Sequence, residues 1–191
     1  MPDYATLARD ARKAVLTMIH RAQSSHVGSN FSCIDILTVL FETMKPEDEI
    51  IFSKGWVAAS AYYFLAEKGV IPKEHLARFC QPGEETYIGL VEPSVPGIRC
   101  AGGSMGYGLP FAVGFGYQKK LDGAPGRIFV LMSDGELDCG TNWEAANAIR
   151  KFNLPVTAIV DMNGFQAMGR TEDVLDVAPA ALFGRWAGCL T

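Results

Sequence analysis

Two short apolar runs with a helical pattern between them constrain the fold of this chain more than any other feature. The runs are Ile128–Met132 and Val156–Val160, and the residues from about Gly140 to Lys151 are typical of a helix. A strand, a crossover helix and a second strand in this order form a parallel pair. The sequence therefore predicts an α/β fold with an open, mostly parallel sheet and helices on both faces.

Each apolar run ends in a polar cluster. Residues 133–136 (Ser-Asp-Gly-Glu) follow the first run, and residues 161–164 (Asp-Met-Asn-Gly) follow the second. In a parallel sheet both clusters lie at the carboxyl edge, where open α/β sheets bind ligands. Carboxylate, amide and backbone carbonyl oxygens suit Mg²⁺ or Ca²⁺ and suit zinc poorly. Asp134 and Asn163 are therefore candidate metal ligands, whereas Asp-Gly or Asn-Gly alone is typical of a turn.

The spacing of Asp134 and Asn163 along the chain resembles the thiamine diphosphate motif, in which Gly-Asp-Gly is followed at about this distance by Asn. The whole stretch from residue 133 to residue 169 is similar to the N-terminal region of transketolases. One departure is visible, because Ser133 stands where the family usually has Gly. The resemblance implies a thiamine diphosphate-binding fold, of which this chain is the diphosphate-binding half.

The same resemblance implies specific site residues. Asp134, Asn163 and the backbone carbonyl of Phe165 would bind the metal, which is Mg²⁺ or Ca²⁺. Gly135 and Glu136, together with Asn163, would contact the thiamine diphosphate that the metal holds. These roles are implied by the family pattern and are expectations at this point.

Composition limits the classes of protein to consider. The 191 residues fit a single domain over residues 1–191, and a formal net charge of −4 without a basic run gives no nucleic-acid footprint. No apolar run approaches the length of a membrane span. The five cysteines form no C-x-x-C pair, so neither a zinc site nor a redox dithiol is indicated. An odd cysteine count without a signal peptide leads us to expect a cytoplasmic location.

The N-terminal part of the sequence predicts two helices, with a candidate site histidine at the junction between them. Residues 4–23 carry an apolar stripe, and residues 24–29 break that helix. Ser32 and Asp35 form a capping-box-like pair that opens a second helix, which Pro46 stops. The junction resembles the transketolase segment Ser-Gly-His-Pro-Gly-Gly, which implies that His26 is a catalytic residue in the substrate channel. The alternative for His26 is a histidine that caps a helix end.

A Ser-Lys-Gly-Trp segment follows a predicted strand, Glu49–Ser53, and precedes a helix that runs to Lys68. Transketolases usually read Ser-Lys-Gly-His here, and the histidine contacts the cofactor diphosphate. Trp56 occupies that position in this chain and is the corresponding candidate for cofactor contact. An indole donates one hydrogen bond but carries no positive charge. The alternative for Trp56 is a residue of the core.

A glycine-rich turn leads into another predicted helix that runs to Leu121. It follows a long loop, residues 80–101, in which the histidine usual in transketolases is missing. The turn resembles the family segment Gly-Ser-Leu-Gly-Gln-Gly-Leu, which implies that Gly103, Ser104 and Met105 contact the cofactor. Gly114 and Gly116 on the following helix would allow close packing at a subunit interface. A last helix is predicted over residues 178–186.

The resemblance covers only the diphosphate-binding half of a transketolase. It implies one subunit of a split transketolase, working with a separate C-terminal transketolase-like subunit that supplies the glutamate activating thiamine diphosphate. The heterodimer would pair with a second copy, and the reaction would move a two-carbon ketol unit from a ketose to an aldehyde. The alternatives are a subunit of a 2-oxo-acid dehydrogenase or decarboxylase, a non-catalytic relic, and a nucleotide-binding domain of the same α/β class.

Overall fold

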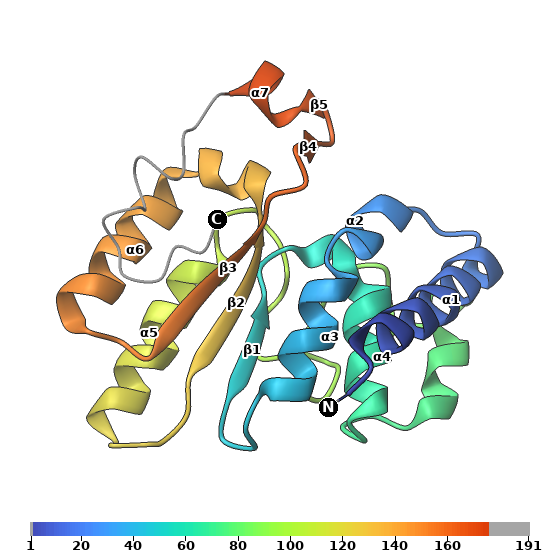
Figure 1. The fold of residues 1–191 in the computed structure, drawn as a ribbon, viewed down its shortest axis with the longest axis horizontal. Coiled ribbons are helices and arrows are strands. Elements are labelled where there is room, and N and C mark those ends of the chain that lie inside the picture. The colour runs from blue at the N-terminus through green and yellow to red at the C-terminus, as the bar shows by residue number, and fades with distance from the viewer. Residues whose placement is uncertain (1, 176–191) are drawn as a thin grey trace.

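A three-stranded parallel sheet lies between two layers of helices (Figure 1) in the computed structural model, which describes residues 2–175. The strands are β1 (Glu49–Phe52), β2 (Ile128–Ser133) and β3 (Val156–Asp161), in the order β1-β2-β3. Ser133 pairs with Asp161, so the ends of β2 and β3 are aligned at the carboxyl edge. The predicted parallel pair, its crossover helix and the α/β fold class are confirmed.

Each face of the sheet is covered by its own group of helices (Figure 1). The face toward the N-terminal part of the chain is covered by α1 (Tyr4–Ala22), α2 (Val27–Phe31), α3 (Ile34–Thr43) and α4 (Ala58–Glu67). The opposite face is covered by α5 (Gly108–Leu121) and α6 (Gly140–Phe152). The short elements are the 3₁₀ turns η1 (Gly55–Val57), η2 (Lys73–Arg78) and η3 (Asp134–Asp138), the strands β4 (Phe165–Gln166) and β5 (Gly169–Arg170), and α7 (Thr171–Val174).

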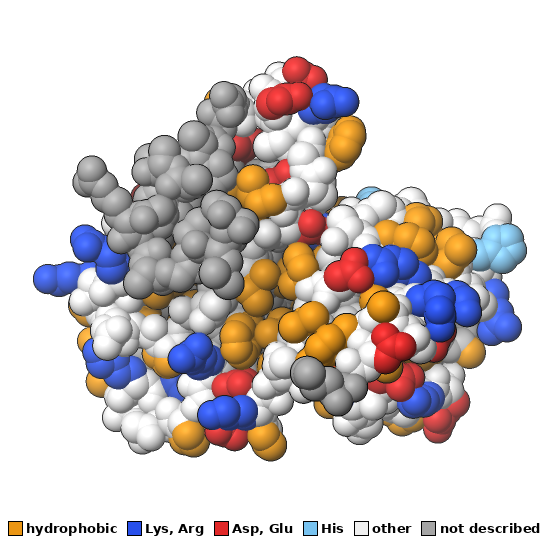
Figure 2. Space-filling view, viewed as in Figure 1, with side chains coloured by type: hydrophobic (Ala, Val, Ile, Leu, Met, Phe, Trp, Pro, Cys, Tyr) orange, Lys and Arg blue, Asp and Glu red, His pale blue; other side chains and the backbone are white. Residues whose placement is uncertain are grey.

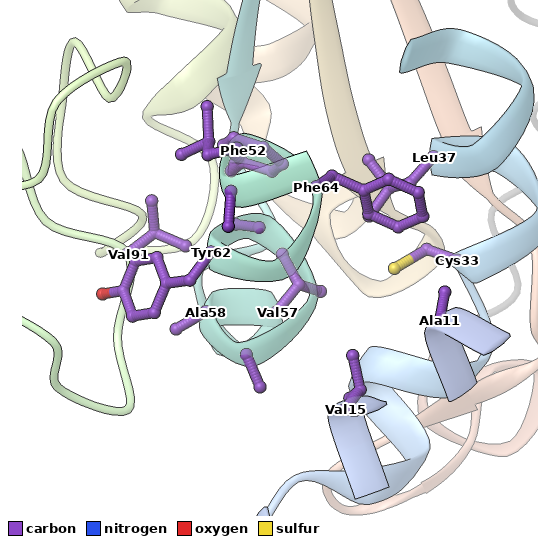
Figure 3. Close-up of a cluster of buried hydrophobic side chains, with 14 of the residues drawn as sticks. Ala11, Val15, Cys33, Leu37, Phe52, Val57, Ala58, Tyr62, Phe64 and Val91 are labelled. Carbon is purple, nitrogen blue, oxygen red and sulfur yellow. The ribbon is translucent and has the colours of Figure 1, made fainter. Parts of the chain in front are cut away.

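Alternate strand residues enter two separate cores, because successive side chains of a strand point to opposite faces. Phe52 and Leu131 pack with α1, α3 and α4, whereas Ile51, Val130 and Met132 pack with α5 and α6. Figure 3 shows the first core, where side chains from α1, α3, α4, the end of β1 and the loop at Val91 meet. The β1 strand is therefore buried on both faces, as expected for a strand of a parallel sheet.

The helices differ from the sequence-based expectation at the α1–α3 junction. A short helix, α2, fills part of the predicted break, and His26 precedes it in the left-handed region with φ +70°. The predicted capping box of Ser32 and Asp35 is wrong, because α3 follows Cys33 and has no side-chain cap. The Ser32 hydroxyl instead donates to Asp161, 2.6 Å away, at the carboxyl end of β3.

The long loop over residues 80–101 is held against α4 and η1. The Tyr62 hydroxyl donates to the carbonyls of Ile88 and Leu90, at 3.2 and 3.0 Å. The Val91 N–H donates to the Gly55 carbonyl, which brings the loop to the carboxyl end of β1.

No helix in the described part of the chain has the length and apolar character of a membrane span. The predicted helix over residues 178–186 lies outside the described residues.

Candidate functional site

Asp134 lies at the start of η3, directly after β2, and its side chain is buried. Oδ1 accepts from the Gly135 N–H at 2.9 Å. Oδ2 accepts from the Gly164 N–H at 2.8 Å and from the Thr171 hydroxyl at 2.9 Å. These contacts fasten the end of β2 to the turn that follows β3, the turn that contains Asn163. The two clusters that the sequence places at the carboxyl edge are therefore in direct contact.

Asn163 and Phe165 form the tight turn that faces Asp134. The Asn163 Oδ1 atom accepts from the Phe165 N–H at 3.0 Å, and Phe165 then starts the β4–β5 hairpin. The Phe165 side chain is exposed and lies under the guanidinium of Arg170. The structure thus brings together the carboxylate, the amide and the backbone segment of the predicted metal ligands.

Buried negative charge exceeds buried positive charge at this edge. Among residues 2–175, three carboxyl groups are buried, those of Asp134, Glu136 and Asp161, and one cationic side chain is buried, that of Lys54. No described Lys, Arg or His lies within ion-pair distance of Asp134. Asp134 and Glu136 both accept hydrogen bonds from the protein, but only Asp134 is bonded to the turn that carries Asn163. Its carboxylate together with the oxygens of that turn makes a set of hard ligands that fits a bound divalent cation.

The predicted ligand set is poor in acidic residues. Within the described residues no three His, Cys, Asp or Glu side chains group in a way that could hold a metal ion. The set predicted here has one carboxylate, with an amide and a main-chain carbonyl as its other oxygen donors. Such hard oxygen ligands are those that Mg²⁺ takes in combination with substrate phosphates and water.

Glu136 joins three segments of the site. Its Oε1 accepts from the Ser53 hydroxyl at the end of β1 and from the Gly106 N–H at 3.2 Å. Its Oε2 accepts from the N–H and hydroxyl of Ser133, at 2.8 and 3.3 Å. The buried Glu136 carboxylate is therefore filled by protein donors that tie the glycine-rich turn to the ends of β1 and β2.

The glycine-rich turn is anchored at both ends and exposed between them. Gly102 and Gly106 are buried, whereas residues 103–105, the predicted cofactor contacts Gly103, Ser104 and Met105, are exposed. Gly102 packs on the main chain of Gly55, and a Cβ atom at Gly102 would lie 2.3 Å from the Gly55 Cα. Only glycine allows so close an approach of two backbone segments.

The two aromatic residues predicted at the site stack on each other. The ring centroids of His26 and Trp56 are 4.4 Å apart, and the ring planes differ by 19°. Asn30 fixes both backbones, since its Nδ2 donates to the carbonyls of His26 and Trp56 at 2.9 and 3.1 Å. Trp56 is 48% exposed, so the alternative of a core tryptophan is wrong.

A buried ion pair lies beside the predicted metal-ligand turn. The Lys54 ammonium donates to Asp161 Oδ2 at 2.5 Å and to the Ser32 hydroxyl at 2.8 Å. The Cys33 thiol lies nearby, and its burial raises the pKa of that thiol to about 12. This cluster connects α2 and α3 to the end of β3.

Sequence reasoning missed the roles of Ser32, Lys54 and Asn30. Lys54 and Asp161 both stand in the motifs that the sequence singles out, Ser-Lys-Gly-Trp and Asp-Met-Asn-Gly. A lysine in an otherwise small and apolar segment is the signal that could have indicated a buried partner. Ser32 and Asn30 carry no such signal, because the contacts of Ser32 with Asp161 and of Asn30 with Ser60 join residues that are distant in the sequence.

Fold and site together define an α/β domain of the transketolase type. A family model described as 1-deoxy-D-xylulose-5-phosphate synthase matches residues 2–174. The chain therefore belongs to this family, within the transketolase family that its motifs resemble.

Two curated relatives carry the names of transketolase subunits. One belongs to the apulose-4-phosphate transketolase of Actinobacillus succinogenes and is 35% identical over 179 residues, which cover 88% of this chain and 65% of the relative. The other, the 6-deoxy-6-sulfo-D-fructose transketolase subunit SqwG of a Clostridium species, is 32% identical over 88% of this chain and 65% of the relative. The chain thus spans slightly less than two thirds of the length of these relatives.

A solved structure has the same fold. The transketolase of Leishmania mexicana superposes with a TM-score of 0.84 at 23% identity, over 96% of this chain and 31% of that chain. At this identity the similarity establishes the fold alone. It confirms the expected α/β architecture with a parallel sheet for nearly all of the chain.

Proposed function

We propose that this chain is one subunit of a split transketolase that uses thiamine diphosphate and a divalent cation. The reaction is the transfer of a two-carbon ketol unit from a ketose to an aldehyde. The observation that carries the proposal is the buried carboxylate of Asp134, which lies beside Asn163 without a cationic partner among the described residues. The names of the two relatives, both transketolase subunits, support the reaction class.

Different residues at the carboxyl edge of the sheet would bind the metal and position the cofactor. Asp134, Asn163 and the Phe165 carbonyl would bind Mg²⁺ or Ca²⁺, and the metal would hold the diphosphate. Gly135 lies in the same segment, where a Cβ atom would meet the Gln166 side chain at 3.0 Å, so its backbone is closely packed. Glu136 acts on the cofactor indirectly in this proposal, because its carboxylate holds the end of β1 and the glycine-rich turn in place.

The exposed turn over residues 103–105 would lie along the ring portion of the cofactor. When bound, thiamine diphosphate would supply a thiazolium ring, an electron sink that stabilises the carbanion of the ketol unit. The chain's contribution is to hold that group in place and to surround it. His26 would hold or move a proton at a substrate oxygen, a role that suits imidazole near neutral pH. Trp56, stacked on His26, would exclude water from that side of the site.

A separate partner subunit would complete the site. Glu136 lies beside the diphosphate motif, so the activating glutamate would come from a C-terminal transketolase-like subunit. The names of both relatives, each a subunit of a transketolase rather than a whole enzyme, are consistent with such a division. We propose that two heterodimers associate and that each site is shared between chains.

Helix α5 offers the face for that contact. Its exposed side includes Phe111, Tyr117 and Leu121, the last of them 68% exposed. A Cβ atom at Gly114 would meet nothing within 4 Å beyond the neighbouring backbone of its own helix, so Gly114 lies open on this side. A Cβ atom at Gly116 would lie 2.8 Å from the Val156 side chain of the same chain. Of the two glycines predicted at an interface, Gly116 therefore serves the internal packing of α5.

In Figure 2, acidic and basic side chains are interspersed over the face shown.

Binding and activity measurements test this function. Thiamine diphosphate binding is measured with and without Mg²⁺, and ketol transfer is measured for the chain, for its partner and for the mixture. Activity of the mixture alone supports the proposal. Metal-independent binding of the cofactor contradicts the assignment of Asp134 and Asn163. Decarboxylation of a 2-oxo acid by the mixture would favour the dehydrogenase or decarboxylase alternative, and a mixture that stays inactive would favour the relic.

A further inference from the structure

Two consecutive residues at the carboxyl end of β1 reach in opposite directions. The Ser53 hydroxyl donates to Glu136, and the Lys54 ammonium donates to Asp161, 2.5 Å away. Both backbone N–H groups donate to the carbonyl of Leu131 on β2, at 2.9 and 3.0 Å. The end of β1 is thereby fixed on β2 while its two side chains extend to either side.

Both carboxylates lie two residues from a predicted metal ligand. Glu136 follows Asp134 by two positions on η3, and Asp161 precedes Asn163 by two positions at the end of β3. The Asn163 Nδ2 atom also donates to the Asp161 carbonyl at 3.4 Å. A displacement of either carboxylate therefore moves the ligand-bearing segment next to it.

The lysine contact crosses the sheet. Strands β1 and β3 are not neighbours, since β2 lies between them. Lys54 and Asp161 nevertheless form a direct ion pair, in which the two side chains are 7% and 5% exposed. Because the pair is closed off from water, it holds its geometry more firmly than a surface ion pair does.

We propose that Ser53 and Lys54 form a clamp that sets the distance between the two metal-ligand segments. Ser53 holds the Asp134 segment through Glu136, and Lys54 holds the Asn163 segment through Asp161. Both act on the predicted ligands through these carboxylates, so both are positioning residues. This inference rests on the proposed function, because it concerns the same metal site.

The first test measures amide hydrogen exchange over residues 161–171 in the full, metal-free chain. We expect Lys54→Met to raise exchange in this segment by about tenfold or more, while α1 and α6 change little. Lys68→Met is the matched control, since it removes the lysine of an exposed ion pair with Glu42. Unchanged exchange in a folded Lys54→Met chain would overturn the clamp.

The second test measures Mn²⁺ binding by electron paramagnetic resonance, with thiamine diphosphate present. Residues that support metal ligands change metal affinity by about 10- to 100-fold when they are replaced. We expect weakening in that range for Lys54→Met and for Ser53→Ala, and near-normal binding for Lys54→Arg and Lys68→Met. If Lys54→Met keeps the Mn²⁺ affinity of the wild type, the clamp alone is overturned. If the wild-type chain binds no Mn²⁺ even with its partner subunit present, the proposed function and the clamp are overturned together.

A double variant separates positioning from general stability. Lys54→Met with Asp161→Asn removes both buried charges, so folding stability should recover relative to the single Lys54→Met variant. If the pair acts as a clamp, Mn²⁺ binding stays weak although thermal stability returns. If the pair contributes stability alone, affinity returns with the stability, and the clamp is refuted.

Discussion

The imidazole of His26 lies face to face on the indole of Trp56, with 4.4 Å between ring centroids. The two residues come from different turns, and buried Asn30 holds both backbones. The tryptophan thus occupies space beside the predicted catalytic histidine and offers no positive charge there. This pairing has a direct consequence for the choice of substrate.

We predict poor activity of the assembled enzyme on the usual phosphorylated ketoses. Trp56→His should raise kcat/KM for xylulose 5-phosphate by roughly tenfold or more, because a hydrogen bond to a charged group contributes about 1.5–3 kcal/mol. Trp56→Phe keeps an aromatic ring and should leave the preference unchanged. A panel of phosphorylated and unphosphorylated ketoses measures the effect. Robust turnover of xylulose 5-phosphate with ribose 5-phosphate by the wild-type enzyme would show that Trp56 does not limit the substrate.

Asp134→Ala should weaken thiamine diphosphate binding by about 100-fold in the presence of Mg²⁺, since it removes the only carboxylate of the predicted ligand set. Asn163→Ala should act in the same direction with a smaller effect. Calorimetry with and without Mg²⁺ measures both. Asp173→Ala, an exposed acid in α7, is the control and should bind normally. Unchanged affinity in Asp134→Ala would remove the metal assignment.

Gly106→Ala should destabilise the chain by about 1–3 kcal/mol, because Gly106 has φ +82° and a Cβ atom would lie 2.6 Å from the Cys139 Cβ. The matched control is Gly114→Ala, at a helical position with open space around it. That change should raise helix stability by up to about 1 kcal/mol. Urea unfolding measures both variants. If the Gly106→Ala and Gly114→Ala variants are equally stable, the turn at Gly106 can rearrange to accept a Cβ atom and the prediction fails.

Phe111→Asp should leave the chain folded and prevent its assembly with the partner subunit. Phe111 is 44% exposed on α5, so the substitution buries no charge within the chain itself. Val39→Asp, at a position 46% exposed on α3, is the control from the opposite layer. Size measurement of the mixture with the partner should give an α₂β₂ assembly for the control and separate chains for Phe111→Asp. Full catalytic activity of the wild-type chain alone would refute the split site.

Alkaline pH should destabilise the folded chain, in part through ionisation of the buried Cys33 thiol. Burial raises the pKa of this thiol from 9.0 to about 12. Above pH 9 the unfolded chain releases the proton and the folded chain keeps it. The contribution of this shift to the free energy of unfolding is therefore fully present below pH 9. It is lost as the pH rises toward 12, by up to ~4 kcal/mol. Cys33→Ala should flatten the fall of unfolding free energy between pH 9 and 11, and Cys80→Ala, at a less buried thiol, should flatten it less.

Much of the sheet was predictable, because its strands are continuous apolar runs that end in polar clusters. The meeting of Asp134 with the turn at Asn163 followed from that pattern, since parallel strands end at one edge. The short helix α2 and the contacts of Ser32 were not predictable from local residues. The Ser32 contacts depend on Lys54 and Asp161, which are far from Ser32 in sequence. Helix α2 is held through Asn30, which contacts Trp56 and Ser60, also distant in sequence.

Glu136 illustrates the same difficulty. Its position beside Asp134 suggested a direct contact with the cofactor, but spacing alone does not show what fills a carboxylate. Four groups donate to it: the N–H and hydroxyl of Ser133, three residues earlier, and the Ser53 hydroxyl and Gly106 N–H from distant segments. The Ser133 contacts form a capping box with a local sequence pattern, whereas the contacts from Ser53 and Gly106 form only in the folded chain and have no local signal.

Strand β3 is bordered by β2 on one side and, within residues 2–175, by no strand on the other. Most of its side chains are only partly buried, and that of Ala158 is exposed. The outward row of peptide groups is a template on which another extended segment can add, in the manner of sheet extension between molecules. The segment that pairs with this edge of β3 therefore determines whether the isolated chain stays monomeric or associates through backbone hydrogen bonds. This holds independently of any side-chain surface.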